Sequence, residues 1–140
     1  SSRGLGDVYK RQSQGYLGKT TTKVSQLKAF IENYPKSALR DDAMYELANS
    51  YVKSNDTDKA MQMYDRLNSE YSRSAFTSKA LLRQGLVYYN SSDNERALSK
   101  FKKVAKDFPG SGEAIQAVST ARLIYIDLGR VDDYANWVRT

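Results

Sequence analysis

Apolar residues recur along most of the chain at the spacing of one face of an α-helix. One face holds Ala43, Leu47 and Tyr51, and the next holds Ala60 and Tyr64. Polar residues fill the positions between them, so each stretch has an apolar and a polar side. This spacing is that of helices rather than of strands. The pattern predicts pairs of amphipathic helices.

The pattern repeats itself every 37 residues. A serine, an alanine and a tyrosine each occur three times at this interval: Ser37, Ser74 and Ser111; Ala43, Ala80 and Ala117; and Tyr51, Tyr88 and Tyr125. Two further series belong to the second helix of each unit: Phe30, Leu67 and Val104; and Tyr34, Tyr71 and Phe108. A constant interval of this length predicts a solenoid, in which each repeat is one helix pair and neighbouring pairs share a core.

Turn-forming residues mark both ends of the predicted helices. We expect Asp56 and Asp93, in the polar segments inside the units, to be N-caps of the second helices, because a short carboxylate accepts hydrogen bonds from free amides. Pro35 and Pro109 each follow an aromatic residue and should end a second helix, since proline cannot continue the hydrogen-bond ladder. Each unit is therefore predicted to be a helix, a tight turn, a helix and an exit turn.

Composition narrows the chemistry that the chain could perform. The 140 residues include no His and no Cys, which removes the usual general base, the usual zinc ligands and any disulfide. The net charge is +6, but 22 basic and 16 acidic residues are interspersed. No apolar run approaches the roughly 20 residues of a membrane-spanning helix. We expect no catalytic residues, no metal, no cofactor and no membrane span.

Two local patterns that could carry chemistry are interpreted as structural. The segment 18–20 (Gly-Lys-Thr) resembles the end of a phosphate-binding loop, but the expected earlier glycine and the preceding strand are absent from the sequence. The adjacent pairs Asp41-Asp42 and Asp132-Asp133 diverge by about 100° on a helix, so neither pair shares a metal or a proton easily. They are expected in first helical turns, where negative charge is favourable.

Four lysines form the single basic cluster of the chain: Lys100, Lys102, Lys103 and Lys106, alongside Phe101. In a nucleic-acid-binding protein such lysines would contact phosphates and binding would depend steeply on salt. Phe101 belongs to the core series, however, so the lysines fall on the outer side of a second helix. We interpret them as a solvated surface and expect no nucleic-acid partner.

The repeated residues resemble the signature of tetratricopeptide repeats. The matching positions are Met44, Leu47, Ala48, Tyr51, Ala60, Tyr64 and Leu67, followed by Leu81, Gly85, Tyr88, Ala97, Phe101, Val104 and Pro109. The resemblance covers residues 16–140 and implies an all-α, right-handed superhelical stack of antiparallel helix pairs. The aromatic-Pro-x-Ser segments 34–37 and 108–111 are similar to those of bacterial envelope proteins, such as outer-membrane-assembly lipoproteins and cell-division coordinators. This implies a periplasmic or outer-membrane-associated location, with the cytoplasm as the alternative.

The repeat divides residues 13–140 into a partial unit (16–36), two full units (37–73 and 74–110) and a truncated unit (111–140). Residues 1–12 take no part in the pattern and are interpreted as a non-native segment. Because the first complete helix lacks its preceding partner and the last helix is short, the chain is predicted to be a fragment of a longer array. Three positions depart from the family pattern. Gln84 stands where leucine is expected, Arg122 replaces a small residue, and Ser72 stands where the other exit turns have proline.

The resemblance implies a non-enzymatic scaffold that binds a segment of another protein in a concave groove lined by the first helices. By register the groove residues are Tyr45, Asn49, Val52, Lys79, Leu82, Leu86, Tyr89, Ser119, Leu123 and Ile126. Only Asn49 matches the residues with which relatives clamp a terminal carboxylate, so an apolar contact is expected instead. The alternatives are that a neighbouring repeat covers this lining, or that the chain is a helical accessory domain of a larger enzyme or regulator.

Overall fold

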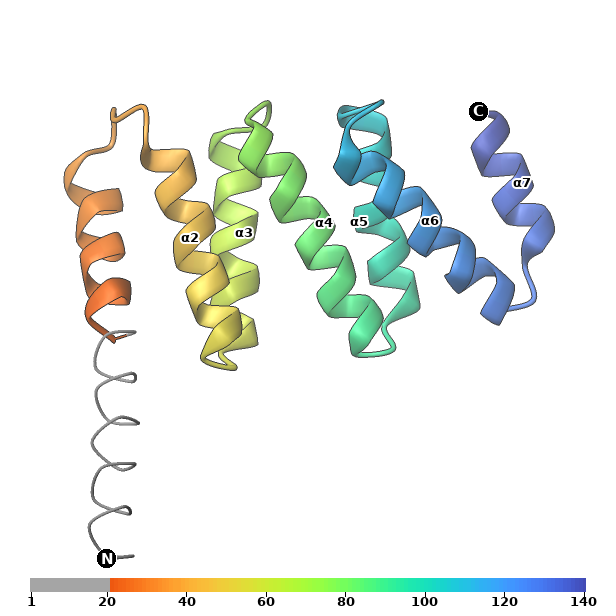
Figure 1. Cartoon of the computed structure of the whole chain (residues 1–140), viewed down its shortest axis with the longest axis horizontal. Helices are drawn as coiled ribbons and strands as arrows, with labels where there is room; N and C mark the ends of the chain where they lie inside the picture. Colours follow the sequence, from red (N-terminus) through yellow and green to blue (C-terminus); the bar gives the residue numbers. More distant parts are fainter. Residues whose placement is uncertain (1–20) are drawn as a thin grey trace, which may run out of the picture. The chain divides into compact units, whose positions relative to one another are not determined.

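The computed structural model describes residues 21–140, which form helices joined by short turns and contain no strand (Figure 1). A helix covers residues 21–33 and is followed by α2 (Arg40–Lys53), α3 (Thr57–Glu70), α4 (Ala75–Asn90), α5 (Asn94–Asp107), α6 (Gly112–Asp127) and α7 (Val131–Arg139). The predicted all-α class and the helix-pair organisation are confirmed. The predictions for segments 1–12 and 18–20 lie outside the described residues.

The chain divides into two compact units, with the boundary between Met63 and Tyr64 inside α3. In the first unit the core contains Ile31, Met44, Leu47, Ala48 and Ala60, all with at most 1% of their surface exposed. The buried Arg40 side chain donates a hydrogen bond from Nε to the carbonyl oxygen of Ile31 at 2.9 Å. This bond satisfies a carbonyl in the last turn of the preceding helix, where no intrahelical partner exists.

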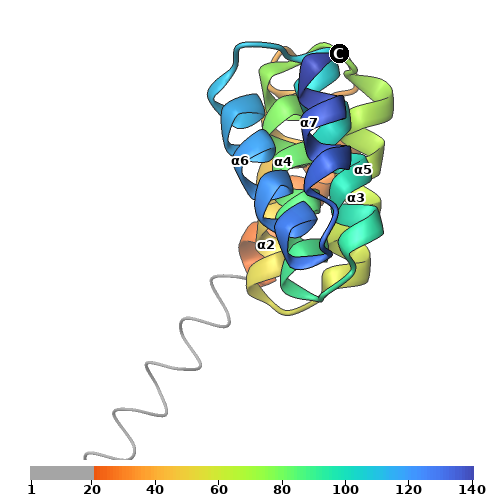
Figure 2. The same ribbon diagram turned by 90° about the vertical axis from the view of Figure 1, so that its right-hand side faces the viewer.

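In the second unit α4 and α5 form an antiparallel pair, α6 packs on both of them, and α7 packs on α6 (Figures 1 and 2). The core is formed by Leu81, Leu82, Ala97, Leu98, Phe101, Val104, Ala117, Ala121, Ile124 and Tyr125. Ala80, Ala97 and Ala117 are completely buried, as expected for small residues where helices approach closely. The alanine series, together with Phe101 and Tyr125, therefore builds the interior of this part of the chain.

The turn between the two helices of a repeat has the same hydrogen bonds in all three repeats. The carbonyl oxygens of Tyr51, Tyr88 and Tyr125 accept from the amides of Asp56, Asp93 and Arg130 at 2.8, 2.9 and 2.7 Å. The residues before these donors, Asn55, Ser92 and Gly129, have φ values of 59°, 61° and 69°. A left-handed residue followed by this bond is the Schellman ending of a helix. The three tyrosines thus hold the same position in equivalent turns, as the 37-residue interval requires.

The second helices begin where the sequence predicts. Asp93 is the N-cap of α5, and its carboxylate accepts a hydrogen bond from the amide of Arg96 at 3.2 Å. Asp56 directly precedes α3, and its carbonyl oxygen accepts the first helical bond from Ala60 at 3.1 Å. The acidic pairs Asp41-Asp42 and Asp132-Asp133 lie in the first turns of α2 and α7, as expected.

The exit turns share hydrogen bonds in all three repeats, although only Ser74 and Ser111 are the N-caps of the helices that follow. The amides of Ser37, Ser74 and Ser111 donate to the carbonyl oxygens of Tyr34, Tyr71 and Phe108 at 3.1, 3.1 and 3.2 Å. The serine hydroxyls accept bonds from the amides of Leu39, Phe76 and Ala114 at 3.1, 3.0 and 3.0 Å. The middle turn forms although Ser72 replaces the proline. The serine, rather than the proline, is therefore the common element of these turns.

The third helix pair differs from the second. Tyr134 occupies the position that Ala97 holds in α5, and Arg122 the position that Gly85 holds in α4. These larger side chains prevent the close approach that Ala97 and Gly85 allow. Accordingly α7 has no buried residue and packs through rings, with the centroids of Tyr125 and Trp137 separated by 6.4 Å.

Candidate functional site

The outer side of α6 carries large apolar side chains that remain exposed. Ile115, Leu123 and Ile126 are 65%, 50% and 45% exposed. Ser119 lies among them at helical spacing, so all four residues share one side of the helix. The opposite side of α6, which includes Ala121, is buried in the core. The exposed apolar residues therefore contribute little to the interior of this unit.

The first helix of the preceding repeat continues this surface. α4 packs directly on α6. Leu82 and Ser119, Leu86 and Leu123, and Tyr89 and Ile126 are each 37 residues apart and hold equivalent positions on these two helices. Leu86 and Tyr89 are half-buried and also contact the core, whereas Leu82 is only 8% exposed. We call the surface formed by Lys79, Leu82, Leu86, Tyr89, Ile115, Ser119, Leu123 and Ile126 the α4–α6 face.

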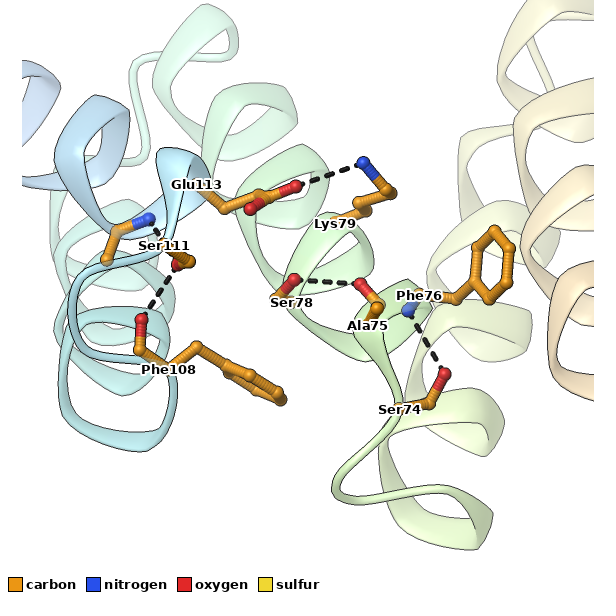
Figure 3. A network of polar contacts seen from close by, with 9 residues as sticks. Ser74, Ala75, Phe76, Ser78, Lys79, Phe108, Ser111 and Glu113 are labelled. Atoms are coloured by element: carbon orange, nitrogen blue, oxygen red, sulfur yellow. Dashed lines mark hydrogen bonds and ion pairs between the residues drawn. The ribbon is translucent and has the colours of Figure 1, made fainter.

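An ion pair ties the two helices of the α4–α6 face together. Lys79 Nζ of α4 lies 3.1 Å from Glu113 Oε1 of α6, and the ends of the two side chains point toward one another (Figure 3). The pKa of the Glu113 carboxyl lies below its ordinary value. The largest cause is the hydrogen bond from the backbone amide of Glu113, and the next is the hydrogen bond from Lys79. Because Lys79 is paired, it is not a free cation available to clamp a partner's carboxylate.

Serine caps fix the ends of α4 and α6. Ser111 Oγ donates to the Phe108 carbonyl oxygen at 2.7 Å and accepts from the Ala114 amide at 3.0 Å (Figure 3). Ser74 Oγ accepts from the amide of Phe76, and Ser78 Oγ donates to the carbonyl of Ala75 at 2.8 Å. Each cap is worth about 1 kcal/mol. These contacts set where both helices begin and hence where the face lies.

The ten predicted groove residues fall into two groups. Seven lie on the α4–α6 face of the second unit. Tyr45, Asn49 and Val52 lie in the first unit, on one side of α2, where Tyr45 is only 8% exposed and the other two are half-buried. Little of Tyr45 and of Leu82 is therefore open to a partner. The assignment of all ten residues to a binding site stays a prediction.

Sequence reasoning missed Ile115, the most exposed apolar residue of the face. The equivalent positions of the other units hold Asp41 and Ser78, both polar. An isoleucine at a position that is polar elsewhere was a signal that could have identified it. The residue extends the apolar surface toward the beginning of α6.

Within residues 21–140 no helix combines the length and the apolar character needed to cross a membrane. The described residues instead define an all-helical repeat protein built from helix pairs at a 37-residue interval. The chain belongs to the tetratricopeptide repeat-like domain family, whose model matches residues 22–135. A tetratricopeptide repeat model also matches residues 4–37. No curated protein shows a significant match.

The family assignment confirms the resemblance of the sequence to tetratricopeptide repeats, and such repeats generally mediate protein–protein interactions. The match to residues 4–37 begins inside segment 1–12. The interpretation of that segment as non-native therefore stays a prediction, as does the division into units.

Proposed function

We propose that this chain is a non-catalytic interaction module that binds a segment of another protein along the α4–α6 face. The observation that carries the proposal is the exposure of Ile115, Leu123 and Ile126 on one side of α6. Several large apolar side chains gathered on one exposed surface are typical of interaction sites. Complete burial of one such side chain contributes about 1.5–3 kcal/mol.

The composition of the face suggests how the partner is held. Its single cation, Lys79, is already paired with Glu113. Affinity should therefore come from burial of the partner's apolar side chains, presented by an extended or helical segment along α4 and α6. Binding of this kind should depend weakly on salt, because screening acts on charges rather than on apolar contacts.

We further propose that the interaction serves an assembly of the bacterial cell envelope, in the periplasm or at the outer membrane, with a cytoplasmic location as the alternative. The support is the likeness of segments 34–37 and 108–111 to the exit turns of envelope tetratricopeptide proteins. In the structure the serine hydroxyl of each segment accepts a hydrogen bond from a following backbone amide. Partner capture from separated envelope and cytosolic fractions distinguishes the two locations.

The test replaces Leu123 and Ile126 together with serine. Both side chains are exposed, so the helical circular dichroism spectrum should be retained while the affinity for captured partners falls at least about tenfold. The matched control is Val131→Ser, which removes a similarly exposed apolar side chain from α7, outside the face. Retention of every partner by the double variant, or an equal loss with the control, would rule out the α4–α6 face as the binding site.

A further inference from the structure

Ion pairs divide the lysine cluster of α5 into two kinds of residue. Lys100 Nζ lies 3.4 Å from a carboxylate oxygen of α3, and Lys103 Nζ lies 2.9 Å from Asp107 Oδ2. Lys102 and Lys106 form no ion pair with any carboxylate in the part of the chain that the structure describes. These two residues are four positions apart and therefore lie on the same side of α5. The expected solvated surface thus contains two adjacent lysines whose charges are not balanced by a carboxylate of the described residues.

Both of these lysines line a pocket of about 530 Å³ between α5, α6 and α7. Its apolar wall contains Val118, Trp137 and Val138. Trp137 is half-buried and Val138 is 53% exposed, so a visiting side chain can reach both. The volume lies within the range of pockets that bind side chains or small molecules. We call it the Lys102–Trp137 pocket.

Aromatic contacts hold the wall of the pocket in place. The ring centroids of Tyr134 and Trp137 are each within 6.4 Å of Tyr125. Lys102 Nζ lies 5.5 Å from the centroid of Tyr125 and 5.7 Å from that of Trp137. A cation over an aromatic face is attracted by the ring quadrupole but keeps its full charge. Lys102 is therefore positioned beside the apolar wall and can still attract an anion.

We propose that the Lys102–Trp137 pocket docks an acidic segment of a partner protein, in which a bulky apolar side chain adjoins carboxylates. The apolar side chain would pack on Trp137, and the carboxylates would reach Lys102 and Lys106. Charge complementarity favours this occupant over a neutral one, because both cations lack a carboxylate in the described residues. The pocket shares no residue with the α4–α6 face and is a separate site.

Trp137 is the only tryptophan of the chain, so its fluorescence reports directly on the pocket. The full chain is titrated with a short peptide that carries one phenylalanine between pairs of glutamates. Two comparison peptides replace the glutamates with lysines, or the phenylalanine with serine. We expect the acidic phenylalanine peptide alone to shift the Trp137 emission, with an affinity that falls as salt is raised.

The variant Lys102→Gln/Lys106→Gln should weaken this binding about two- to thirtyfold, the effect of losing two exposed ion pairs. The matched control, Lys53→Gln/Lys103→Gln, removes two exposed lysines that do not line the pocket and should bind as the unmodified chain does. Both variants change only exposed side chains, and circular dichroism verifies that they remain folded.

Several results would overturn the proposal. An unchanged Trp137 emission, equal binding of the lysine peptide, or equal weakening in the control variant would each show that no acidic segment docks there. A single-stranded oligonucleotide that shifts the emission more strongly than the peptide would assign the lysines to nucleic acid. Sedimentation showing a dimer that dissociates in Val138→Ser would assign the pocket to a second copy of the chain.

Discussion

Gln84 Nε2 donates a hydrogen bond of 2.7 Å to Asp65 Oδ1 and so connects the middle of α4 to α3. Gln84 is completely buried, and its Oε1 accepts a second bond from Asn68 Nδ2 at 2.8 Å. The equivalent position is Leu47 in the preceding repeat and Ala121 in the following one. The departure from the family pattern is thus a core amide with both of its polar ends bonded, as a buried amide requires.

The first prediction concerns this pair of bonds. Gln84→Leu restores the residue of the repeat pattern but leaves the Nδ2 of Asn68 without its acceptor. Asn68 Oδ1 is already buried without a partner in the described part of the chain. We expect a loss of about 1–3 kcal/mol in the free energy of unfolding, measured by urea denaturation, since an orphaned buried donor loses its solvation.

The double variant Gln84→Leu/Asn68→Leu provides the control. When both polar partners are replaced by apolar groups, the cost of the unpaired donor disappears, and most of the lost stability should return. Asp65 remains exposed and keeps its ion pair with Lys100, so it should add little to the difference. A double variant less stable than the single one would contradict this explanation.

Gly85 is required by the ring of Phe101. A Cβ atom at Gly85 would lie 2.4 Å from Phe101 Cε1 and 2.6 Å from Cδ1, and the ring is completely buried. Gly85→Ala should therefore destabilise the chain by about 1–3 kcal/mol in thermal or urea denaturation, despite the better helix propensity of alanine.

Gly112 offers a matched control for this substitution. A Cβ atom there meets no heavy atom within 4 Å, so Gly112→Ala should be neutral or stabilising by up to about 1 kcal/mol. The added variant Phe101→Leu should reduce the penalty of Gly85→Ala, because the smaller side chain removes the close contact. Equal effects of the two alanine substitutions would show that the contact with Phe101 is unimportant.

The 37-residue interval predicted the helix pairs because each backbone turn depends on a few nearby residues, and these residues recur every 37 positions. Ser74 and Ser111 cap α4 and α6 through their hydroxyl oxygens, and Asp93 caps α5 as expected. These contacts involve residues only a few positions apart, so the sequence alone contains the information. The same interval identified the buried alanine series and the tyrosine series, of which Tyr51 and Tyr125 are buried and Tyr88 is partly buried.

Contacts between distant residues could not be derived in the same way. The bond between Gln84 and Asp65 joins residues 19 positions apart, and nothing in the local pattern indicates it. Likewise, the sequence does not show that Lys103 is paired while Lys102 lies over Trp137. For the candidate site, the repeat register predicted that Leu123 and Ile126 lie on an exposed surface. It did not predict how accessible each side chain is.

The left-handed residues of the inner turns give opposite predictions for two substitutions. Ser92 has a φ of 61° and Gly129 a φ of 69°. A residue with a side chain costs about 1–2 kcal/mol in this left-handed region, and glycine avoids this cost. Glycine in turn loses about 0.5–1 kcal/mol, because its unfolded chain has more conformational freedom. Ser92→Gly should therefore stabilise by up to about 1 kcal/mol, and Gly129→Ala should destabilise by a similar amount. Thermal denaturation of both variants measures the two signs, and a stabilising Gly129→Ala would contradict the assigned turn.

The last prediction uses the lowered pKa of Glu113. A carboxyl whose pKa is lower in the folded than in the unfolded chain stabilises the fold above its unfolded pKa, and the contribution disappears as the pH falls through the folded pKa. We expect Glu113→Gln to cost about 0.3–1 kcal/mol above about pH 5, and the difference from the unmodified chain to narrow at lower pH. Urea denaturation as a function of pH provides the measurement.

The causes of this lowered pKa can be separated with Lys79→Gln. The backbone hydrogen bond of Glu113 is the largest cause, followed by the hydrogen bond from Lys79, and the charge of Lys79 adds to them. Lys79→Gln leaves the backbone hydrogen bond in place, so its pH-dependent loss should be less than that of Glu113→Gln. Because Lys79 also belongs to the α4–α6 face, this variant shows in addition whether the ion pair contributes to partner capture. Equal pH-dependent losses in the two variants would mean that Lys79, rather than the backbone hydrogen bond of Glu113, holds the carboxylate in its charged form.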